Sequence, residues 1–315
     1  MKVVFMGTPE AALPVLDGLV SSGHEVLAVY TRPDRPAGRG MTLMQPAIKV
    51  YAGEKGIRVL QPTSLSSNRV AEELALLEPK AMIVAAFGRK IPMEMLAMAP
   101  LGAINIHPSL LPKHRGPSPV ITTVLEGDAI TGVTVMGLDE GMDTGPILAQ
   151  QETPVLHGET AGNLTRRLFE RGAKLLTKTL PLLEKGELIP MPQKEAEASL
   201  TRLYTRADGE MDWSLSAEAL ERRLRAFDPW PGCFTYWRGK YLKIIRAQAI
   251  KSGRVEKKEG LVIPTKKGGT VVAGVVTRDG VLVLEEVQLQ GRRRLSIDRF
   301  ILGQPDFVGA SLGRA

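Results

Sequence analysis

The sequence of 315 residues is poor in cysteine and in long apolar runs. Its single cysteine, Cys233, excludes a disulfide within the chain and favours a reducing compartment. No apolar run approaches the roughly 18–20 residues that span a bilayer, and the chain reaches Pro9 and Glu10 too early for a signal peptide. We therefore expect a cytoplasmic protein that makes no contact with membranes.

Two ligand-binding patterns are also missing. The turn after the first predicted strand reads Gly7-Thr8-Pro9-Glu10 and lacks the G-x-G-x-x-G pattern. It places a proline and a carboxylate where a pyrophosphate needs free N–H groups and no negative charge. No P-loop is present, and no cysteines and histidines have the spacing of metal ligands. These absences argue against NAD binding and against a bound metal.

The first 107 residues alternate between short apolar segments and amphipathic ones. We expect strands at residues 3–5, 25–30, 58–60, 81–86 and 103–106, and helices at residues 9–22, 46–55, 68–77 and from residue 92. Thr8 suits the cap of the first helix. The alternation predicts an α/β fold with a Rossmann-like parallel sheet, covered by helices on both faces, that binds ligands beyond the carboxyl ends of its strands.

The rest of the chain changes character. Paired strands are expected at residues 131–137 and 147–152, and a long helix at residues 158–184. Residues 185–204 combine prolines, a glycine and a polar run, which is typical of a linker. Short strands separated by Gly and Lys turns follow; they predict a small OB-like β-barrel, although a sandwich would show the same strand count. The predicted organisation is a first domain at residues 1–189, a linker at 190–204 and a second domain at 205–315.

The net charge of +7 comes from the last third of the chain. From Thr205 onward there are 20 Lys and Arg residues against 13 Asp and Glu, whereas residues 1–204 hold 21 of each kind. This asymmetry indicates a polyanionic partner for the C-terminal part. A solvated basic surface that keeps the protein soluble would give the same excess.

The stretch from Gly102 to Pro117 carries the candidate chemistry. Asn105 and His107 are two residues apart on a predicted strand, so their side chains share one face at its carboxyl end. Asp143, in an acidic turn, adds a carboxylate to this amide and imidazole, and acyl transfer to an amine requires these three groups. Taken singly, the same residues also suit an ordinary strand end and turn. The surrounding motif must therefore decide between a catalytic and a purely structural role for them.

The motif Asn105-Ile-His107-Pro-Ser-Leu-Leu-Pro112, with Asp143 in Asp139-Glu-Gly-Met-Asp-Thr-Gly-Pro146, resembles the folate-dependent formyltransferases in spacing and in flanking residues. The resemblance implies 10-formyltetrahydrofolate as the formyl donor. It also implies that Asn105 and His107 polarise the formyl oxygen, and that Asp143 orients His107 and relays a proton from the attacking amine. The folate contacts that it implies are Phe87, Ile91, Ser109, Leu110, Leu111, Pro112, Leu138 and Asp139.

Three further segments resemble those members of this family that act on the methionine of initiator methionyl-tRNA. They are the arm at residues 31–40, Asp212-Trp-Ser-Leu-Ser216, and Arg225-Ala-Phe-Asp-Pro-Trp-Pro-Gly232. The resemblance also implies a monomer. The arm has arginines among prolines and glycines, and guanidinium groups bind phosphates and base edges. The residues expected to contact tRNA are Arg32, Arg35, Arg39, Lys266, Lys267, Arg292 and Arg293.

Two alternatives stay open. The protein could formylate a small amine, such as a sugar amine or glycinamide ribonucleotide, or it could bind tRNA without catalysis. The second domain, which the nucleotide-biosynthesis enzyme lacks, argues against the first alternative. The intact set of Asn105, His107 and Asp143 argues against the second.

Overall fold

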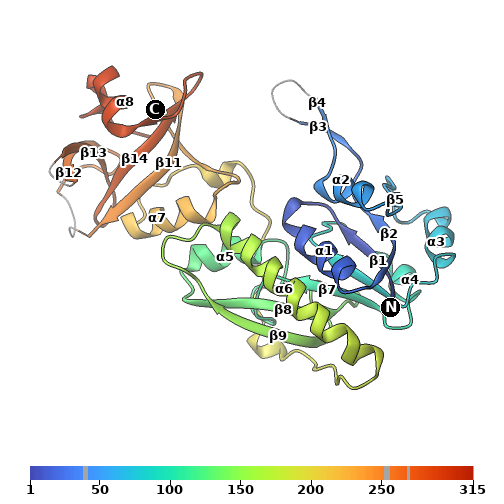
Figure 1. Ribbon diagram of the computed structural model, residues 1–315. Coiled ribbons are helices and arrows are strands. Elements are labelled where there is room, and N and C mark those ends of the chain that lie inside the picture. The colour runs from blue at the N-terminus through green and yellow to red at the C-terminus, as the bar shows by residue number, and fades with distance from the viewer. Residues whose placement is uncertain (38–41, 252–255, 268–269, 315) are drawn as a thin grey trace. The chain divides into compact units, whose positions relative to one another are not determined.

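The chain folds into two compact units. The computed structural model describes residues 1–37, 42–251, 256–267 and 270–314 (Figure 1). The first unit comprises Met1–Pro119, Ala129–Val155 and Leu164–Arg202, and the second comprises Val120–Asp128, Leu156–Asn163 and Leu203–Ala315. The second unit therefore includes two short segments that interrupt the first in sequence.

A seven-stranded sheet forms the centre of the first unit, in the order β5-β2-β1-β6-β7-β8-β9. Its strands are β1 (Lys2–Gly7), β2 (Glu25–Tyr30), β5 (Val59–Leu60), β6 (Ala81–Ala85), β7 (Ala103–His107), β8 (Ile130–Gly137) and β9 (Ile147–Pro154). The pairs from β5 to β7 are parallel, β8 is antiparallel to β7, and β9 is antiparallel to β8. The sheet is mostly parallel, and the predicted pairing of residues 131–137 with 147–152 is confirmed.

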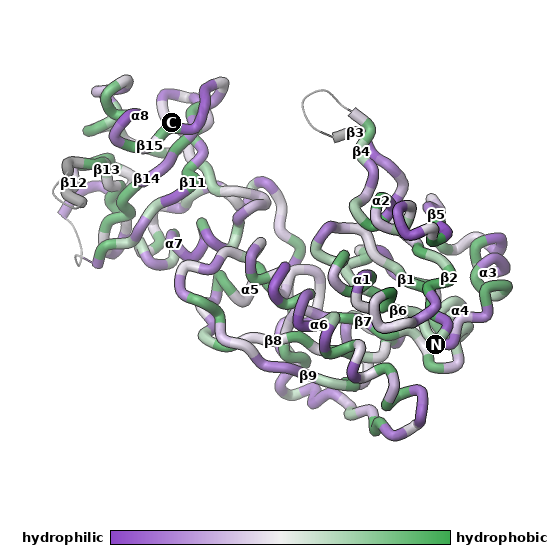
Figure 2. The backbone as a smooth tube through the Cα atoms, viewed as in Figure 1, coloured by the Kyte–Doolittle hydropathy of each residue, from purple (hydrophilic) through white to green (hydrophobic). Residues whose placement is uncertain are grey.

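Helices cover both faces of this sheet (Figure 1). They are α1 (Leu13–Ser21), α2 (Ala47–Glu54) and α6 (Ala161–Glu184) on one face, and α3 (Asn68–Ala75) and α4 (Met93–Leu96) on the other. Figure 2 shows hydrophobic and hydrophilic residues alternating along α6, as expected for a helix that buries one side. Because both faces are covered, β6 is buried at every position.

The predicted cap at Thr8 is wrong. Pro9 is extended, with ψ 159°, and a short 3₁₀ turn (Glu10–Ala12) precedes α1, which begins without a side-chain cap. The helix begins later than expected because Pro14 occupies its first turn, where the fixed φ of proline favours helix and its missing N–H costs nothing. The Oγ1 atom of Thr8 is buried, and no described residue bonds to it.

The second unit is built on an antiparallel sheet in the order β10-β11-β14-β13-β12, with β15 paired to β14. Its strands are β10 (Cys233–Trp237), β11 (Lys240–Ile250), β12 (Val262–Lys267), β13 (Thr270–Val276), β14 (Val281–Leu289) and β15 (Leu295–Ser296), and its helices are α5 (Pro119–Glu126), α7 (Ala217–Ala226) and α8 (Ile297–Gly303). Ser216 caps α7 by accepting the Ala219 N–H. The predicted α/β domain followed by a β domain is confirmed.

One apolar core of the second unit is aromatic. The rings of Trp237, Phe300 and Phe307 pack edge to face, with centroids 5.0–5.8 Å apart. All three are buried, and α8 and a 3₁₀ turn (Pro305–Phe307) supply the two phenylalanines. Among the described residues, no helix has both the length and the apolarity needed to cross a membrane.

Candidate active site

The candidate site begins at the carboxyl end of β7. This strand lies between β6 and β8, and the side chains of Ala103, Asn105 and His107 share one face of the sheet. Asn105 is half-buried, whereas His107 is only 4% exposed. Within the described chain no hydrogen bond occupies the Asn105 amide, so it is available to a ligand.

His107 is held by one ring nitrogen and faces a carboxylate with the other. Its Nε2 lies 3.0 Å from the carbonyl oxygen of His114, and its Nδ1 lies 3.6 Å from Oδ2 of Asp143. Burial lowers the pKa of His107, while Asp143 and the His114 carbonyl raise it by less. The ring is therefore neutral at neutral pH. A carbonyl oxygen only accepts, so the proton of the neutral ring is on Nε2, which donates to His114. The lone pair on Nδ1 then faces Asp143.

Asp143 reaches this imidazole from the turn at residues 138–146. Its backbone is left-handed, with φ +56°, and its Oδ2 accepts the N–H of Gly116 at 2.8 Å. The structure thus brings Asp143 next to His107, through a turn that is bonded to the loop after β7, and Asn105 lies on the same face of β7 as His107.

The loop at residues 108–117 is fixed by the neighbouring strands. The Thr134 hydroxyl on β8 donates to the carbonyl of Ser109 at 2.7 Å, and the Gln150 amide on β9 donates to the carbonyl of Leu111 at 2.7 Å. The Ser109 hydroxyl donates to the Lys113 carbonyl at 2.6 Å and is buried. The Ser109 side chain therefore shapes the loop. No sequence pattern singles out Thr134 or Gln150, because both lie in ordinary alternating strands.

The other predicted folate residues form two groups. Phe87 and Ile91 are buried in the core beneath α3 and α4, and Leu138 packs against this core and against the small cluster around Leu111. Asp139 is exposed, and its Oδ1 accepts the Thr144 hydroxyl at 2.7 Å. Leu110 and Pro112 are half-buried on the loop. Leu138 is the residue that connects the two clusters.

Sequence reasoning missed two polar residues beside the site. Gln193 donates to the Asp143 carbonyl at 2.8 Å, and Arg115 donates to the Gln193 side-chain oxygen at 3.0 Å. No local sequence pattern distinguishes Gln193, because it belongs to a polar segment with the composition of a linker.

The predicted tRNA-binding residues lie in both units. Arg32 donates to the carbonyl of Gly88, while Arg35 is exposed in a hairpin of β3 (Arg35–Ala37) and β4 (Thr42–Met44). Arg39 lies outside the described residues. In the second unit, the last two residues of β12 are Lys266 and Lys267, and the exposed turn after β14 carries Arg292 and Arg293.

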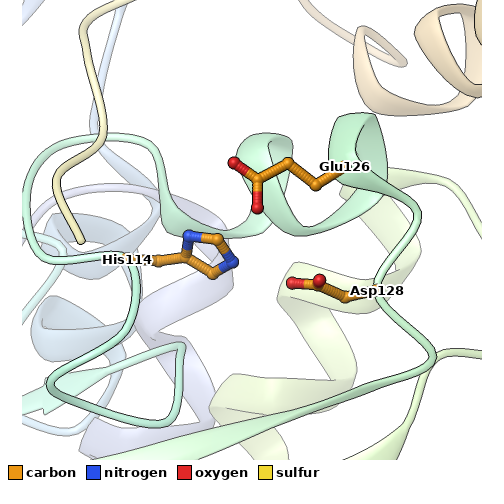
Figure 3. A group of neighbouring side chains, drawn as sticks. All are labelled: His114, Glu126 and Asp128. Carbon is orange, nitrogen blue, oxygen red and sulfur yellow. The ribbon is translucent and has the colours of Figure 1, made fainter. Parts of the chain in front are cut away.

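We assign no cation site to the side chains drawn in Figure 3. They are His114, Glu126 at the end of α5, and Asp128 in the turn after it. An imidazole and two carboxylates are possible metal ligands. However, His114 belongs to the first unit and the two carboxylates to the second, so they do not define one site.

Known proteins resemble this chain along nearly its whole length. The methionyl-tRNA formyltransferase of Chloroflexus aurantiacus is 44% identical over 303 residues, which cover 96% of this chain and 97% of that protein. The methionyl-tRNA formyltransferase of Alkaliphilus oremlandii is 36% identical over 313 residues, which cover 99% of this chain and 100% of that protein.

Solved structures share the fold. HypX from Aquifex aeolicus, in complex with tetrahydrofolic acid, is 20% identical with a TM-score of 0.66; the match covers 96% of this chain and 47% of HypX, so this chain spans about half the length of HypX. The N-formyltransferase from Helicobacter canadensis is 19% identical with a TM-score of 0.66, over 94% of this chain and 100% of that protein.

The family follows from two matches. Residues 204–305 match the formyl transferase C-terminal domain. Residues 1–180, which carry Asn105, His107 and Asp143, match formyl transferase itself. The chain belongs to the formyl transferase family.

Proposed function

We propose that this protein transfers a formyl group from 10-formyltetrahydrofolate to the α-amine of methionine on initiator methionyl-tRNA, in the cytoplasm and as a monomer. The similarity to methionyl-tRNA formyltransferases along 96% of the chain carries this proposal, because it includes both domains. The product serves translation initiation.

In the proposed mechanism the amine attacks the formyl carbon, and the developing oxyanion receives a hydrogen bond from the Asn105 amide. Asp143 takes the proton that the amine loses and passes it towards Nδ1 of His107, which lies 3.6 Å from its Oδ2. Nε2 keeps its bond to the His114 carbonyl, so the N–H newly formed at Nδ1 is the second donor to the oxyanion. Cleavage of the bond between the formyl carbon and N10 then returns the proton to N10 and releases tetrahydrofolate.

The loop at residues 108–117, the turn at residues 138–146 and the segment at residues 87–92 form the folate site in this proposal. The loop offers Leu110 and Pro112, which are half-buried, whereas Phe87 and Ile91 support the site from the core. The tRNA contacts are assigned to the arginines of the arm and to the basic residues of the second unit. Arg35 supports this assignment because its side chain is exposed.

The test is an acceptor comparison. Formyl transfer is measured with charged initiator tRNA, charged elongator tRNA and a panel of small amines that includes glycinamide ribonucleotide and a nucleotide-linked amino sugar. The proposal expects turnover on charged initiator tRNA and much less on the other acceptors. Turnover on a small amine, with none on charged initiator tRNA, would overturn it.

A further inference from the structure

Residues 190–202, predicted to be a linker, are anchored on the first unit. Met191 and Ile147 exchange two backbone hydrogen bonds of 2.8 Å at the start of β9. Further along, the N–H of Arg115 donates to the Ser199 carbonyl at 2.9 Å, and the N–H of Thr201 donates to the Arg115 carbonyl at 2.7 Å. The segment is therefore fixed to β9 at one end and to the loop at residues 108–117 at the other.

Gln193 lies between these anchors and reaches the turn that carries Asp143. Its Nε2 donates to the carbonyl of Asp143 at 2.8 Å and to the carbonyl of Gly145 at 2.7 Å. A side-chain amide nitrogen has two hydrogens, so both are used on this turn. The two bonds hold the backbone on either side of Thr144.

The backbone of Asp143 has an uncommon conformation. With φ +56° it lies in the left-handed region, which residues other than glycine occupy at a cost and which aspartate enters more often than most. The Oδ2 atom that lies near His107 Nδ1 is attached to this residue, and the Gly116 N–H is its hydrogen-bond donor. Because Gln193 holds the backbone of Asp143, it determines how the carboxylate faces the imidazole.

Arg115 determines which way the Gln193 amide points. Its Nε donates to Oε1 of Gln193 at 3.0 Å, and its Nη1 bonds both carboxylate oxygens of Glu195, at 3.0 and 2.9 Å. The Arg115 side chain is 3% exposed, so its position is fixed by packing. A guanidinium group only donates. The amide oxygen must therefore face Arg115, which leaves the amide nitrogen for the turn.

We propose that Gln193 is a positioning residue for the transfer reaction and that Arg115 fixes its orientation. This inference rests on the proposed function for its kinetic readout. Gln193 acts through Asp143, so its loss should lower catalysis by displacing the carboxylate. Gln193 is then the residue through which this segment supports the active site.

Gln193→Met tests the proposal, because it removes both donors at similar side-chain volume. The matched control is Glu197→Gln, on the same segment, where the carboxylate is exposed and bonds Lys194. We expect kcat of Gln193→Met to fall about 10- to 100-fold, with the KM for the formyl donor within about twofold. Glu197→Gln should keep native kinetics. A kcat of Gln193→Met equal to that of the control would overturn the proposal.

A double-variant comparison separates positioning from general damage to the fold. In an Asp143→Asn background, adding Gln193→Met should lower kcat by no more than about twofold, because the two residues act as one unit. Full additivity of the two losses would overturn the proposal. If Gln193→Met does not fold, Gln193→Asn, which keeps the amide but is shorter, is measured in the same way.

An NMR titration gives a readout that does not need activity. The chain has only four histidines, so the His107 ring signals can be assigned with a His107→Gln variant. The Asp143 carboxylate and the His114 carbonyl raise the pKa of His107, whereas the charge of the His114 ring lowers it. A displaced Asp143 carboxylate should therefore shift the His107 titration to lower pH in Gln193→Met and not in the control Glu197→Gln. An unchanged titration would overturn the proposal. If the native protein transfers no formyl group at all, the proposed function fails, and this titration still decides the role of Gln193.

Discussion

Oδ2 of Asp143 lies 3.6 Å from Nδ1 of His107, and the same oxygen accepts the backbone N–H of Gly116 at 2.8 Å. The other ring nitrogen of His107 is bonded to the carbonyl of His114 at 3.0 Å. Both contacts of the imidazole therefore come from outside β7, one from the following loop and one from a distant turn. The carboxylate and the imidazole keep their relative placement only while that loop and that turn stay bonded.

Replacing Asp143 by asparagine should remove the charge but keep an oxygen that accepts the Gly116 N–H. Without a carboxylate, the proton of the attacking amine has no acceptor beside Nδ1 of His107. We expect kcat for formyl transfer to fall about 10²- to 10⁴-fold, with little change in the free energy of unfolding. Single-turnover assays with charged initiator tRNA measure the first quantity, and urea denaturation measures the second.

Glu152→Gln is the control for this change, because Glu152 is an exposed carboxylate on β9 outside the proposed folate site. It should transfer formyl groups at the native rate. An Asp143→Asn protein with activity within threefold of native would exclude the proton-relay role.

The buried imidazole of His107 should make stability depend on pH. In the unfolded chain histidine titrates near its ordinary value of 6.5, whereas burial lowers the pKa of His107 in the folded protein. Between these two pKa values the unfolded state binds more protons, so the free energy of unfolding falls as the pH falls below 6.5. His107→Gln should lose less stability than the native protein between about pH 6.5 and pH 5.

Urea denaturation across this pH range checks the expectation. The pKa of His24 is also lowered by burial, but His24 is present in both proteins, so its effect cancels in the comparison. His157→Gln, a change at an exposed histidine, should follow the native pH dependence. Parallel curves for His107→Gln and the native protein would contradict the expectation.

The sequence was sufficient to predict those features that depend on residues close together in the chain. Strand β7 begins at Ala103 as predicted and extends one residue further, to His107. The shared face of Asn105 and His107 follows from a period of two. The α/β alternation likewise predicted the sheet, because each strand in its centre is a short apolar run. The placement of Asp143 beside His107 could not be derived from periodicity and was implied by the family motif.

The sequence was insufficient where single side chains bond distant backbone groups. Thr134, Gln150 and Gln193 each donate to a carbonyl in a loop or turn far along the chain. Such bonds depend on where two loops meet, and a polar residue in a strand or a proline-rich segment does not signal them. The same limit explains the error at Thr8, where a local capping pattern was overridden by an extended Pro9 and a later helix start.

Substitutions in the arm should affect tRNA more than folate. Arg35 is exposed in β3, and Arg39 belongs to the part of the arm outside the described residues. If these guanidinium groups contact phosphates, Arg35→Ala and Arg39→Ala should each raise the KM for tRNA severalfold. Each should also lower the slope of the logarithm of this KM against the logarithm of the salt concentration by about one. The KM for the formyl donor should stay unchanged.

Lys55→Ala, at an exposed residue just after α2, is the control for the two arm variants. Equal effects on both KM values would remove the arm from the tRNA site.

Gly116 should tolerate no side chain. Its φ is +107°, and a Cβ there would lie 2.9 Å from the Thr201 hydroxyl oxygen and 3.0 Å from the Thr201 carbonyl oxygen. Both the strained backbone and the crowding act against Gly116→Ala, which should lower the free energy of unfolding by about 1–3 kcal/mol. Because the Gly116 N–H is the donor to Asp143, the loop shift that relieves the crowding should also lower kcat.

Gly186→Ala separates these two causes. Gly186 has a positive φ of +70°, but nothing lies within 4 Å of the position that its Cβ would take. It should lose stability through backbone strain alone, by about 1 kcal/mol, and should keep native kcat. Urea denaturation and formyl-transfer kinetics on both variants make the comparison. If Gly116→Ala kept native kcat, then the Gly116 N–H would not be what aligns Asp143 with His107, and the alignment would have to come from the Gln193 side of the turn.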